Sequence, residues 1–196
     1  MADAEVAKTI YISPEALVEK ALACKDARNI GVAFTYNEPL VGWEYIRDAG
    51  AQIKKAGMKN VLVTNGTASP EVLEEILPLT DAMNIDLKGF QESYYRDLGG
   101  DLETVKEFIR HAASGCHVEL TTLIVPDKND RISEMEKEAE WIASVGALAD
   151  KEIPLHVTRF FPRYHMTDRE ATTVEKVYSL AKAARKYLKY VFVGNC

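Results

Sequence analysis

Short apolar segments alternate with longer amphipathic segments along most of the 196 residues. The apolar segments have the length and composition of buried strands, and the segments between them repeat their apolar positions with a helical period. Six strands are predicted, at residues 30–35, 60–64, 82–87, 117–125, 154–157 and 190–193. Strict alternation of strands and helices predicts an α/β fold with a parallel sheet and right-handed crossover connections.

Local signals place the helices between these strands. Ser13 and Ser69 each precede Pro-Glu, which suits an N-cap, a first-turn proline and a first-turn acid, and Gly57 suits a left-handed C-cap. Helices are predicted at about residues 14–24, 40–56, 70–77, 102–114, 132–145 and 173–187. Two further segments are predicted to be exposed: the loop 89–100, whose Tyr-Tyr-Arg is a candidate rim or lid, and the charged run 134–140.

The alternation also bears on domain organisation. It predicts either a doubly wound sheet or a partial or closed barrel, and the length fits a single domain over residues 1–196. Because the first predicted element is a helix, the alternation implies that a first strand is missing upstream. The polar, alanine-rich residues 1–11 are predicted to be loosely ordered.

Polar side chains gather where three of the predicted strands end. They are Asn37, Glu38, Thr64, Asn65, Asp86 and Lys88. The C-terminal ends of parallel strands meet at one edge of a sheet, so we expect these side chains to face a common cleft.

Each of these groups also has a structural interpretation. Asp86 and Lys88 share one face of their strand, where they either pair with each other or bind a zwitterion or a small carboxylate. Glu38 is either a ligand-binding acid or a first-turn acid that interacts with the helix dipole. Thr64-Asn65-Gly66 is also compatible with a plain Asx-turn.

The later strands carry a second group of candidates. His156 and Arg159 lie in and just after the next-to-last strand, and Thr121 and Thr122 lie within an otherwise apolar strand. A single histidine near a strand is more often packed and hydrogen-bonded than catalytic. Arg159 precedes two phenylalanines, which suits an anion, a stacked ring or a structural ion pair.

Composition and charge narrow the classes of function. Apolar content of 47% and charged content of 28% are ordinary for a globular protein, and a net charge of −6 disfavours a nucleic-acid-binding surface. No apolar run has the length of a membrane helix and no signal-peptide core is present, so we predict a cytoplasmic protein without a membrane partner. The motifs of P-loop NTPases, Rossmann dehydrogenases, zincins and serine hydrolases are absent.

Several motifs, taken in order, resemble those of the radical SAM superfamily. More narrowly, they are similar to the AmmeMemoRadiSam-system radical SAM enzymes, often labelled pyruvate formate-lyase activating enzyme-like, from about Tyr11 to Asn195. The motifs are Tyr36-Asn37-Glu38-Pro39, Thr64-Asn65-Gly66, Asn84-Ile85-Asp86-Leu87-Lys88-Gly89, the strand from Glu119 to Pro126, His156-Val157-Thr158-Arg159-Phe160-Phe161-Pro162 and the terminal Tyr190 to Asn195. The first and the fifth are fairly specific, whereas Thr-Asn-Gly and Asp-Leu-Lys occur throughout the superfamily.

The resemblance implies a partial (β/α)6 TIM-like barrel that holds S-adenosylmethionine across its strand ends. Asn37 and Glu38 occupy the place of the family's Gly-Gly-Glu motif, whose acid meets the methionine amino group. Thr64, Asp86 and Lys88 match the stretch that holds the methionine carboxylate, in some relatives through a bound cation. The remaining cofactor-binding residues predicted in this way are Asn65, Thr121, His156 and Arg159.

The sequence departs from the family at two positions and in one motif. Val63 stands where relatives often carry an acid, which weakens the case for a cation, and Thr121 stands where some relatives carry Arg. In the family, a CxxxCxxC motif on the loop after the first strand binds a 4Fe-4S cluster, just upstream of where this chain begins. Cys24, Cys116 and Cys196 are too widely separated to replace that motif, so no metal ligands are predicted in this chain.

We therefore predict the core fragment, or a naturally truncated relative, of a radical SAM enzyme with a protein or small-molecule substrate. With an upstream cluster segment such an enzyme generates a 5′-deoxyadenosyl radical for hydrogen abstraction, whereas this chain alone is predicted neither to bind the cluster nor to cleave the cofactor. One alternative is a cofactor-free barrel lyase or aldolase, with Lys88 as Schiff-base nucleophile and Asp86 or His156 as acid/base. Another is a non-catalytic binding domain. An open barrel edge also predicts dimerisation.

Overall fold

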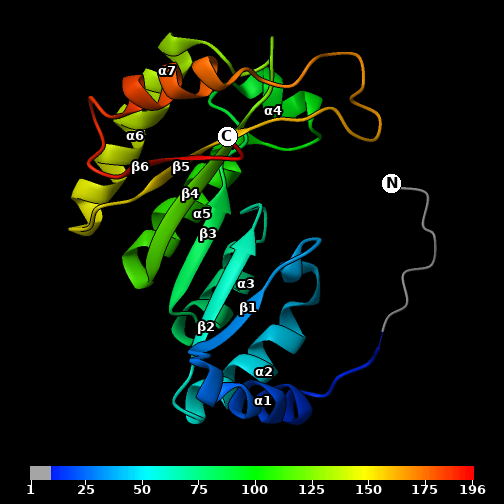
Figure 1. Ribbon diagram of the computed structural model, residues 1–196. Coiled ribbons are helices and arrows are strands. Elements are labelled where there is room, and N and C mark those ends of the chain that lie inside the picture. Colours follow the sequence, from blue (N-terminus) through cyan, green and yellow to red (C-terminus); the bar gives the residue numbers. More distant parts are fainter. Residues whose placement is uncertain (1–9) are drawn as a thin grey trace.

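The computed structural model describes residues 10–196, and its six strands form one sheet. The strands follow one another in sequence order from β1 to β6, and every neighbouring pair is parallel (Figure 1). They are β1 (Gly31–Phe34), β2 (Lys59–Thr64), β3 (Ala82–Asp86), β4 (His117–Ile124), β5 (Leu155–Arg159) and β6 (Val191–Gly194). This order confirms the partial TIM-like barrel and excludes the doubly wound alternative, in which the strand order reverses.

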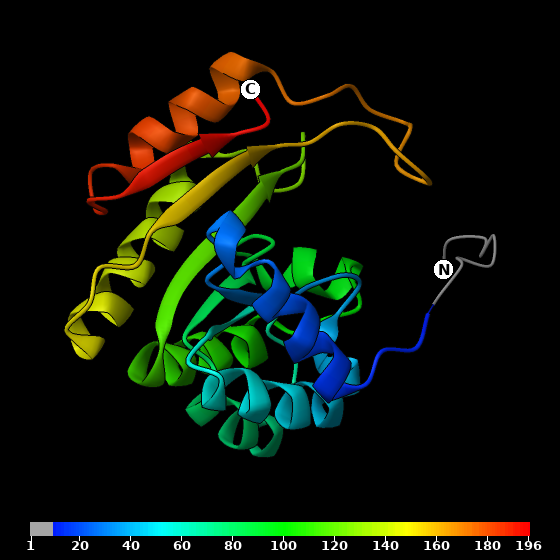
Figure 2. The ribbon, with the colours of Figure 1, turned by 60° about the horizontal axis from the view of Figure 1, so that its bottom comes forward.

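The helices lie on one side of this sheet and leave the other side open (Figures 1 and 2). They are α1 (Pro14–Ala23), α2 (Trp43–Lys55), α3 (Pro70–Ile76), α4 (Glu92–Asp97), α5 (Leu102–Gly115), α6 (Ile132–Ala149) and α7 (Val174–Ala184). Three short 3₁₀ turns join them: η1 (Lys25–Ala27), η2 (Pro39–Gly42) and η3 (Leu77–Leu79). Ser13 Oγ caps α1 by accepting from Ala16 N and Gly57 has φ of 73°, as predicted, whereas Ser69 precedes α3 without a side-chain capping hydrogen bond.

Burial alternates along the strands and separates an outer face, under the helices, from an open inner face. In β4 the buried outer residues are Val118, Leu120, Thr122 and Ile124, and the inner residues are His117, Glu119, Thr121 and Leu123. The two-residue period of a strand therefore decides which side chains can reach a ligand on the open face.

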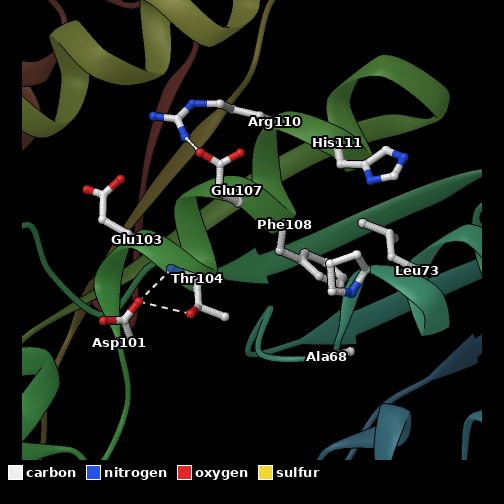
Figure 3. Close-up of a pocket in the computed structure, with 10 residues that line it drawn as sticks. Ala68, Leu73, Asp101, Glu103, Thr104, Glu107, Phe108, Arg110 and His111 are labelled. Atoms are coloured by element: carbon white, nitrogen blue, oxygen red, sulfur yellow. Dashed lines mark hydrogen bonds and ion pairs between the residues drawn. The ribbon is translucent and has the colours of Figure 1, made fainter.

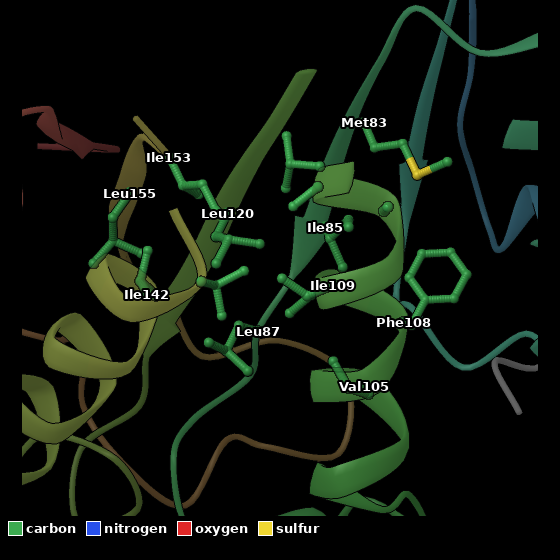
Figure 4. Close-up of a cluster of buried hydrophobic side chains, with 14 of the residues drawn as sticks. Met83, Ile85, Leu87, Val105, Phe108, Ile109, Leu120, Ile142, Ile153 and Leu155 are labelled. Carbon is green, nitrogen blue, oxygen red and sulfur yellow. The ribbon is translucent and has the colours of Figure 1, made fainter. Parts of the chain in front are cut away.

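The hydrophobic core fills the space between the outer face and the helices. Figure 4 shows Ile85 and Leu120 from the strands packed against Val105 and Ile109 of α5, all fully buried. Burying one such aliphatic side chain contributes about 1.5–3 kcal/mol. The strands are thus fixed from outside, so the inner face is free to carry polar residues.

The loop predicted at residues 89–100 is wrong in part, because Glu92–Asp97 forms α4. Tyr94 and Tyr95 are 8% and 3% exposed, so they anchor this segment to the core and do not form a mobile rim or lid. A helix of six residues has too few apolar positions for its period to be recognised in the sequence.

The charged run at residues 134–140 is also not simply a solvated face. Glu134 and Glu138 lie four residues apart on the inward side of α6 and are 5% and 1% exposed. Glu138 accepts a 2.5 Å hydrogen bond from Thr122 Oγ1, and Glu134 accepts one of 2.9 Å from Phe90 N. Polar partners in the sheet and in the loop after β3 permit this burial, and a one-dimensional pattern does not show such partners.

Two expectations concern parts of the chain that bear less on the site. The prediction of loose order for residues 1–11 falls mainly on residues 1–9, which are outside the described part; Ile10 and Tyr11 are strongly exposed. Within residues 10–196, no helix is long and apolar enough to cross a membrane.

Candidate functional site

A polar cavity of about 320 Å³ lies at the C-terminal ends of β1, β2 and β3. Its lining residues are Thr35, Tyr36, Asn37, Glu38, Val63, Thr64, Asn65, Asp86 and Lys88. The three strand ends named in the sequence analysis thus contribute to one cavity, because parallel strands in sequence order end on the same rim.

Glu38 joins the ends of β1 and β2. Its Oε1 accepts hydrogen bonds from Leu40 N at 3.2 Å and Thr64 Oγ1 at 2.7 Å, and its Oε2 accepts from Asn65 N at 2.7 Å. A carboxylate accepts about four hydrogen bonds, so these three leave little capacity for a ligand. The observed role of Glu38 is therefore to hold the cavity wall together. Its direct contact with the amino group of the methionine part of S-adenosylmethionine stays a prediction.

Asp86 and Lys88 carry the opposite charges of the cavity. Lys88 Nζ lies 2.5 Å from Asp86 Oδ2, so the pairing considered from the sequence is present. The two side chains are 31% and 41% exposed and therefore accessible from the cavity. A zwitterionic ligand can replace this ion pair with two of its own, one to each residue.

The main chain of Lys88 is held from both sides by residues outside the cavity. Lys88 N donates to Tyr95 Oη at 3.0 Å, and Asn129 Nδ2 donates to Lys88 O at 2.7 Å. Burial raises the pKa of Tyr95 well above its ordinary value, so its hydroxyl stays protonated. Asn129 is 2% exposed and also accepts from Val125 N, which links the end of β4 to Lys88.

Three predicted cofactor residues lie outside this cavity lining. Thr121 sits beside Asp86 in the sheet and donates from Oγ1 to Asn84 Oδ1 at 2.9 Å. His156 Nε2 lies 2.7 Å from Glu119 Oε2. Arg159 donates to Thr172 O at 2.5 Å and stacks over Phe161 at 4.7 Å, so its guanidinium is used within the connection after β5.

The sequence analysis missed the partners that surround these residues. Glu119 lies on the inner face of β4 between His117 and His156, and it bonds to both. The signal was present, because His117, Glu119 and Thr121 alternate along the strand and therefore share one face. Asn129 and Tyr95 left no such signal, because Asn129 reaches Lys88 O across 41 residues and Tyr95 lies in a helix too short to be recognised from its period.

A larger groove, of about 770 Å³, lies between α3 and α5 and shares no lining residue with the strand-end cavity (Figure 3). Its polar groups serve local roles: Asp101 caps α5 by accepting from Thr104 N at 2.7 Å, and Glu107 pairs with Arg110. Size alone does not make a site, and this groove gathers no convergent set of reactive groups. The smaller strand-end cavity is the better candidate.

The described residues do not supply a metal centre. Across residues 10–196 no group of three or more His, Cys, Asp and Glu side chains is arranged to hold a metal ion. Cys24 and Cys196 are exposed, whereas Cys116 is buried, and burial raises its pKa to about 11. Cluster ligands are thiolates that converge on one point, so these three residues do not fit a 4Fe-4S cluster.

Comparison with known proteins finds, over most of the chain, the family that the sequence motifs resemble. Residues 5–142 match the family model described as the radical SAM superfamily. An uncharacterised protein of Methanocaldococcus jannaschii, MJ0808, is 37% identical over 94% of this chain and 54% of its own length. The pyruvate formate-lyase 1-activating enzyme of Escherichia coli K12 is 27% identical over 64% of this chain and 53% of its own. The chain spans about half the length of these curated relatives.

Solved structures share the fold. A domain of a pyruvate-formate lyase-activating enzyme from Bacteroides vulgatus superposes with a TM-score of 0.70 at 18% identity, over 84% of this chain and 99% of that one. Streptococcus suis SuiB bound to S-adenosylmethionine superposes with a TM-score of 0.66 at 8% identity, over 93% of this chain and 42% of that one. The family model matches well over half of the sequence, and the sheet has the matching architecture: the chain belongs to the radical SAM superfamily.

Proposed function

We propose that this protein is the S-adenosylmethionine-binding core of an activating-enzyme-like radical SAM enzyme. The observation that carries the proposal is the Asp86–Lys88 pair, open to the strand-end cavity and flanked by the ends of β1 and β2. The similarity to the E. coli activating enzyme and the fold shared with SuiB, whose structure contains S-adenosylmethionine, support it.

The residues present fit the amino-acid end of the cofactor. Its α-carboxylate matches the Lys88 ammonium and its α-ammonium matches the Asp86 carboxylate. Asn37 and Asn65 offer amide groups at the rim, and Glu38 keeps both strand ends in place. These contacts bind the cofactor and fix its orientation. A cofactor held in one orientation defines the position at which the substrate must be bound to react.

When bound next to a reduced 4Fe-4S cluster, S-adenosylmethionine supplies a 5′-deoxyadenosyl radical that abstracts hydrogen from the substrate. The CxxxCxxC motif for that cluster is absent from these 196 residues. We therefore expect that anaerobic reconstitution of this polypeptide with iron and sulfide gives no stable cluster. About four irons per chain with a broad visible absorbance would contradict this expectation.

Calorimetric titration of S-adenosylmethionine tests the binding proposal. The wild-type chain is expected to bind, and Lys88→Ala and Asp86→Asn are each expected to weaken binding at least about tenfold, which corresponds to about 1.4 kcal/mol. Lys182→Ala, an exposed lysine on α7, serves as the charge-matched control and should leave the affinity unchanged. Equal affinity in all variants, or no binding by the wild type at millimolar cofactor, would refute the proposal.

A second candidate uses the same lysine as a Schiff-base nucleophile, with Asp86 at 2.5 Å as the acid/base. Such lysines are activated by an apolar environment or a neighbouring cation, whereas Lys88 is 41% exposed and faces a carboxylate. Borohydride reduction in the presence of small ketones and aldehydes, followed by mass spectrometry of the Lys88 peptide, separates the two functions. A trapped adduct at Lys88 favours the lyase.

A further inference from the structure

A second polar cluster lies on the open face of the sheet and serves neither the strand-end cavity nor the core. Glu119 is at its centre, with Oε1 lying 3.1 Å from His117 Nε2 and Oε2 lying 2.7 Å from His156 Nε2. His156 also stacks on Phe192 of β6, with ring centroids 5.3 Å apart and an interplanar angle of 27°. Both contacts fix the plane of the His156 ring. We call His117, Glu119 and His156 the inner-face triad.

The register of the sheet places His156, one member of this triad, in the same row as Asp86, whereas Glu119 and His117 pair with Asn84 and Ala82, nearer the N-terminal ends of the strands. Asp86 pairs with Thr121, Thr121 with His156, and His156 with Phe192, so these residues form one row across the inner face. Neighbouring strands are about 4.8 Å apart, so His156 lies about 10 Å along this row from Asp86. A molecule bound on the triad would therefore lie next to a cofactor held by Asp86 and Lys88.

The charge of this face is uneven. Partial burial acts to raise the pKa of Glu119, but the hydrogen bonds from His117 and His156 outweigh it, and the pKa lies below its ordinary value. The side chain is therefore a carboxylate at neutral pH. Asp86 and Lys88 neutralise each other, and the Arg159 guanidinium is turned to Thr172 O and Phe161. Glu119 is therefore a negative group with no cationic lysine or arginine partner among residues 10–196.

Glu119 also has capacity left for a ligand. Each oxygen bonds to one imidazole nitrogen, and a carboxylate accepts about four hydrogen bonds. The histidines donate to it through Nε2, which leaves their Nδ1 atoms as acceptors when the rings are neutral. Phe192, 49% exposed, adds an aromatic surface at the side. Acceptors around a carboxylate next to an aromatic ring are the groups that bind an ammonium ion.

We propose that the inner-face triad is the substrate-recognition site of this enzyme and that Glu119 binds a protonated amine of the substrate. The proposal rests on the proposed function, because that function gives the neighbouring row its cofactor. An anionic substrate group is disfavoured by the carboxylate. A metal ion is disfavoured because the imidazoles bond to opposite oxygens of Glu119, and no metal-holding group exists within the described range.

The experiment is a titration of cofactor-free protein, labelled with ¹⁵N in its histidines, with n-butylamine and, separately, with sodium acetate at constant ionic strength and neutral pH. We expect n-butylammonium to shift the imidazole resonances of His117 and His156 in a saturable way. Glu119→Gln should weaken that binding at least fivefold. Glu140→Gln, an exposed glutamate of α6, is the matched control and should leave it unchanged.

Three results would overturn the proposal: no saturable response to n-butylamine, equal affinity in Glu119→Gln, or binding of acetate in place of the amine. Should Glu119→Gln not fold, Glu119→Asp keeps the charge, withdraws it from the ligand, and is expected to weaken amine binding as well. S-adenosylmethionine calorimetry on the same variants keeps the two proposals apart. If Lys88→Ala loses cofactor binding and Glu119→Gln does not, the cofactor proposal is supported. If Glu119→Gln loses amine binding and Lys88→Ala does not, the amine-binding proposal is supported.

Discussion

Three glutamates of this protein have three different roles, which depend on what surrounds each carboxylate. Glu38 accepts from a hydroxyl and two main-chain N–H groups and ties two strand ends together. Glu119 stands on the open face between two imidazoles and keeps accessible lone pairs. Glu138 is fully enclosed behind the sheet, where Thr122 Oγ1 is its hydrogen-bond partner. The same functional group is thus a brace, a candidate ligand-binding group and a buried acid.

Glu138 makes stability depend on pH. Burial raises its pKa from an ordinary 4.5 to about 8, so the folded protein retains a proton that the unfolded chain releases above about pH 4.5. This contribution to stability is full below pH 4.5 and is lost as pH rises toward 8. Each pH unit between the two pKa values changes the free energy of unfolding by about 1.4 kcal/mol, so the wild type should lose a few kcal/mol of stability from this group. Glu138→Gln should abolish that loss in urea unfolding at pH 5 and pH 8.

The control for this prediction is Glu140→Gln, which changes an exposed carboxylate on the same helix. It should keep the pH dependence of the wild type, since an exposed carboxylate has a similar environment in the folded and unfolded chains. A Glu138→Gln variant that loses stability between pH 5 and pH 8 as steeply as the wild type would show that Glu138 ionises normally.

At the scale of elements, the site depends on segments that do not touch the cavity. α4 supplies Tyr95 and the loop after β4 supplies Asn129, and together they hold the main chain of Lys88. α6 supplies Glu134, which accepts from Phe90 N just beyond Lys88. A strand end is otherwise a flexible place, so the precision of the Asp86–Lys88 pair comes from these neighbouring elements.

Asn129→Ala tests this support. The change leaves Val125 N and the carbonyls of Lys88 and Leu123 without their partner, which should lower the free energy of unfolding by roughly 2–3 kcal/mol. It should also weaken S-adenosylmethionine binding severalfold, because Lys88 loses an anchor. Chemical denaturation and calorimetry measure the two effects.

Lys128→Ala is the neighbouring control for that test. Lys128 pairs with Asp97 at 2.9 Å near the surface, and such pairs contribute about 0–1 kcal/mol. Its removal should change neither property substantially. An Asn129→Ala variant that matches Lys128→Ala in both measurements would show that Lys88 is positioned without Asn129.

At the scale of the whole molecule, the protein is a curved sheet with helices on one side and an uncovered inner face (Figure 2). Within residues 10–196, β1 pairs only with β2 and β6 only with β5, so no further strand covers either lateral edge, although Val191 O at the β6 edge accepts from Arg185 Nη2 at 2.8 Å. Exposed sheet edges favour association with another chain. The same openness leaves the proposed substrate-recognition triad on an uncovered face.

We expect dimerisation through the β1 edge, seen as concentration-dependent mass in analytical ultracentrifugation between about 1 and 100 µM, the range in which exposed edges become association-prone. Ala33→Lys places a charge on this edge strand and should shift the protein toward monomer. Ala147→Lys adds the same charge on the exposed side of α6 and should not. A wild type that stays monomeric throughout this range contradicts the prediction.

The sequence by itself determined the order of the strands and the rim on which the candidate site lies. Apolar periodicity marks the six strands and every longer helix, though not the six-residue α4, and alternation forces parallel strands, whose C-terminal ends meet on one edge. The polar residues after the first three strands therefore share a cavity, as predicted. The motifs at those positions also indicated the superfamily that the family model then confirmed.

Only the tertiary structure decided which of these polar groups serve one another. Glu38 meets Thr64 and Asn65 across 26 and 27 residues, and Asn129 reaches Lys88 across 41. Glu119 finds its second histidine 37 residues away, at a position set by the β4–β5 register. Sequence patterns report local periodicity, whereas burial, hydrogen bonding and pKa depend on neighbours that packing brings together. The long-range hydrogen-bond partners of the candidate site were therefore identified only from the tertiary structure.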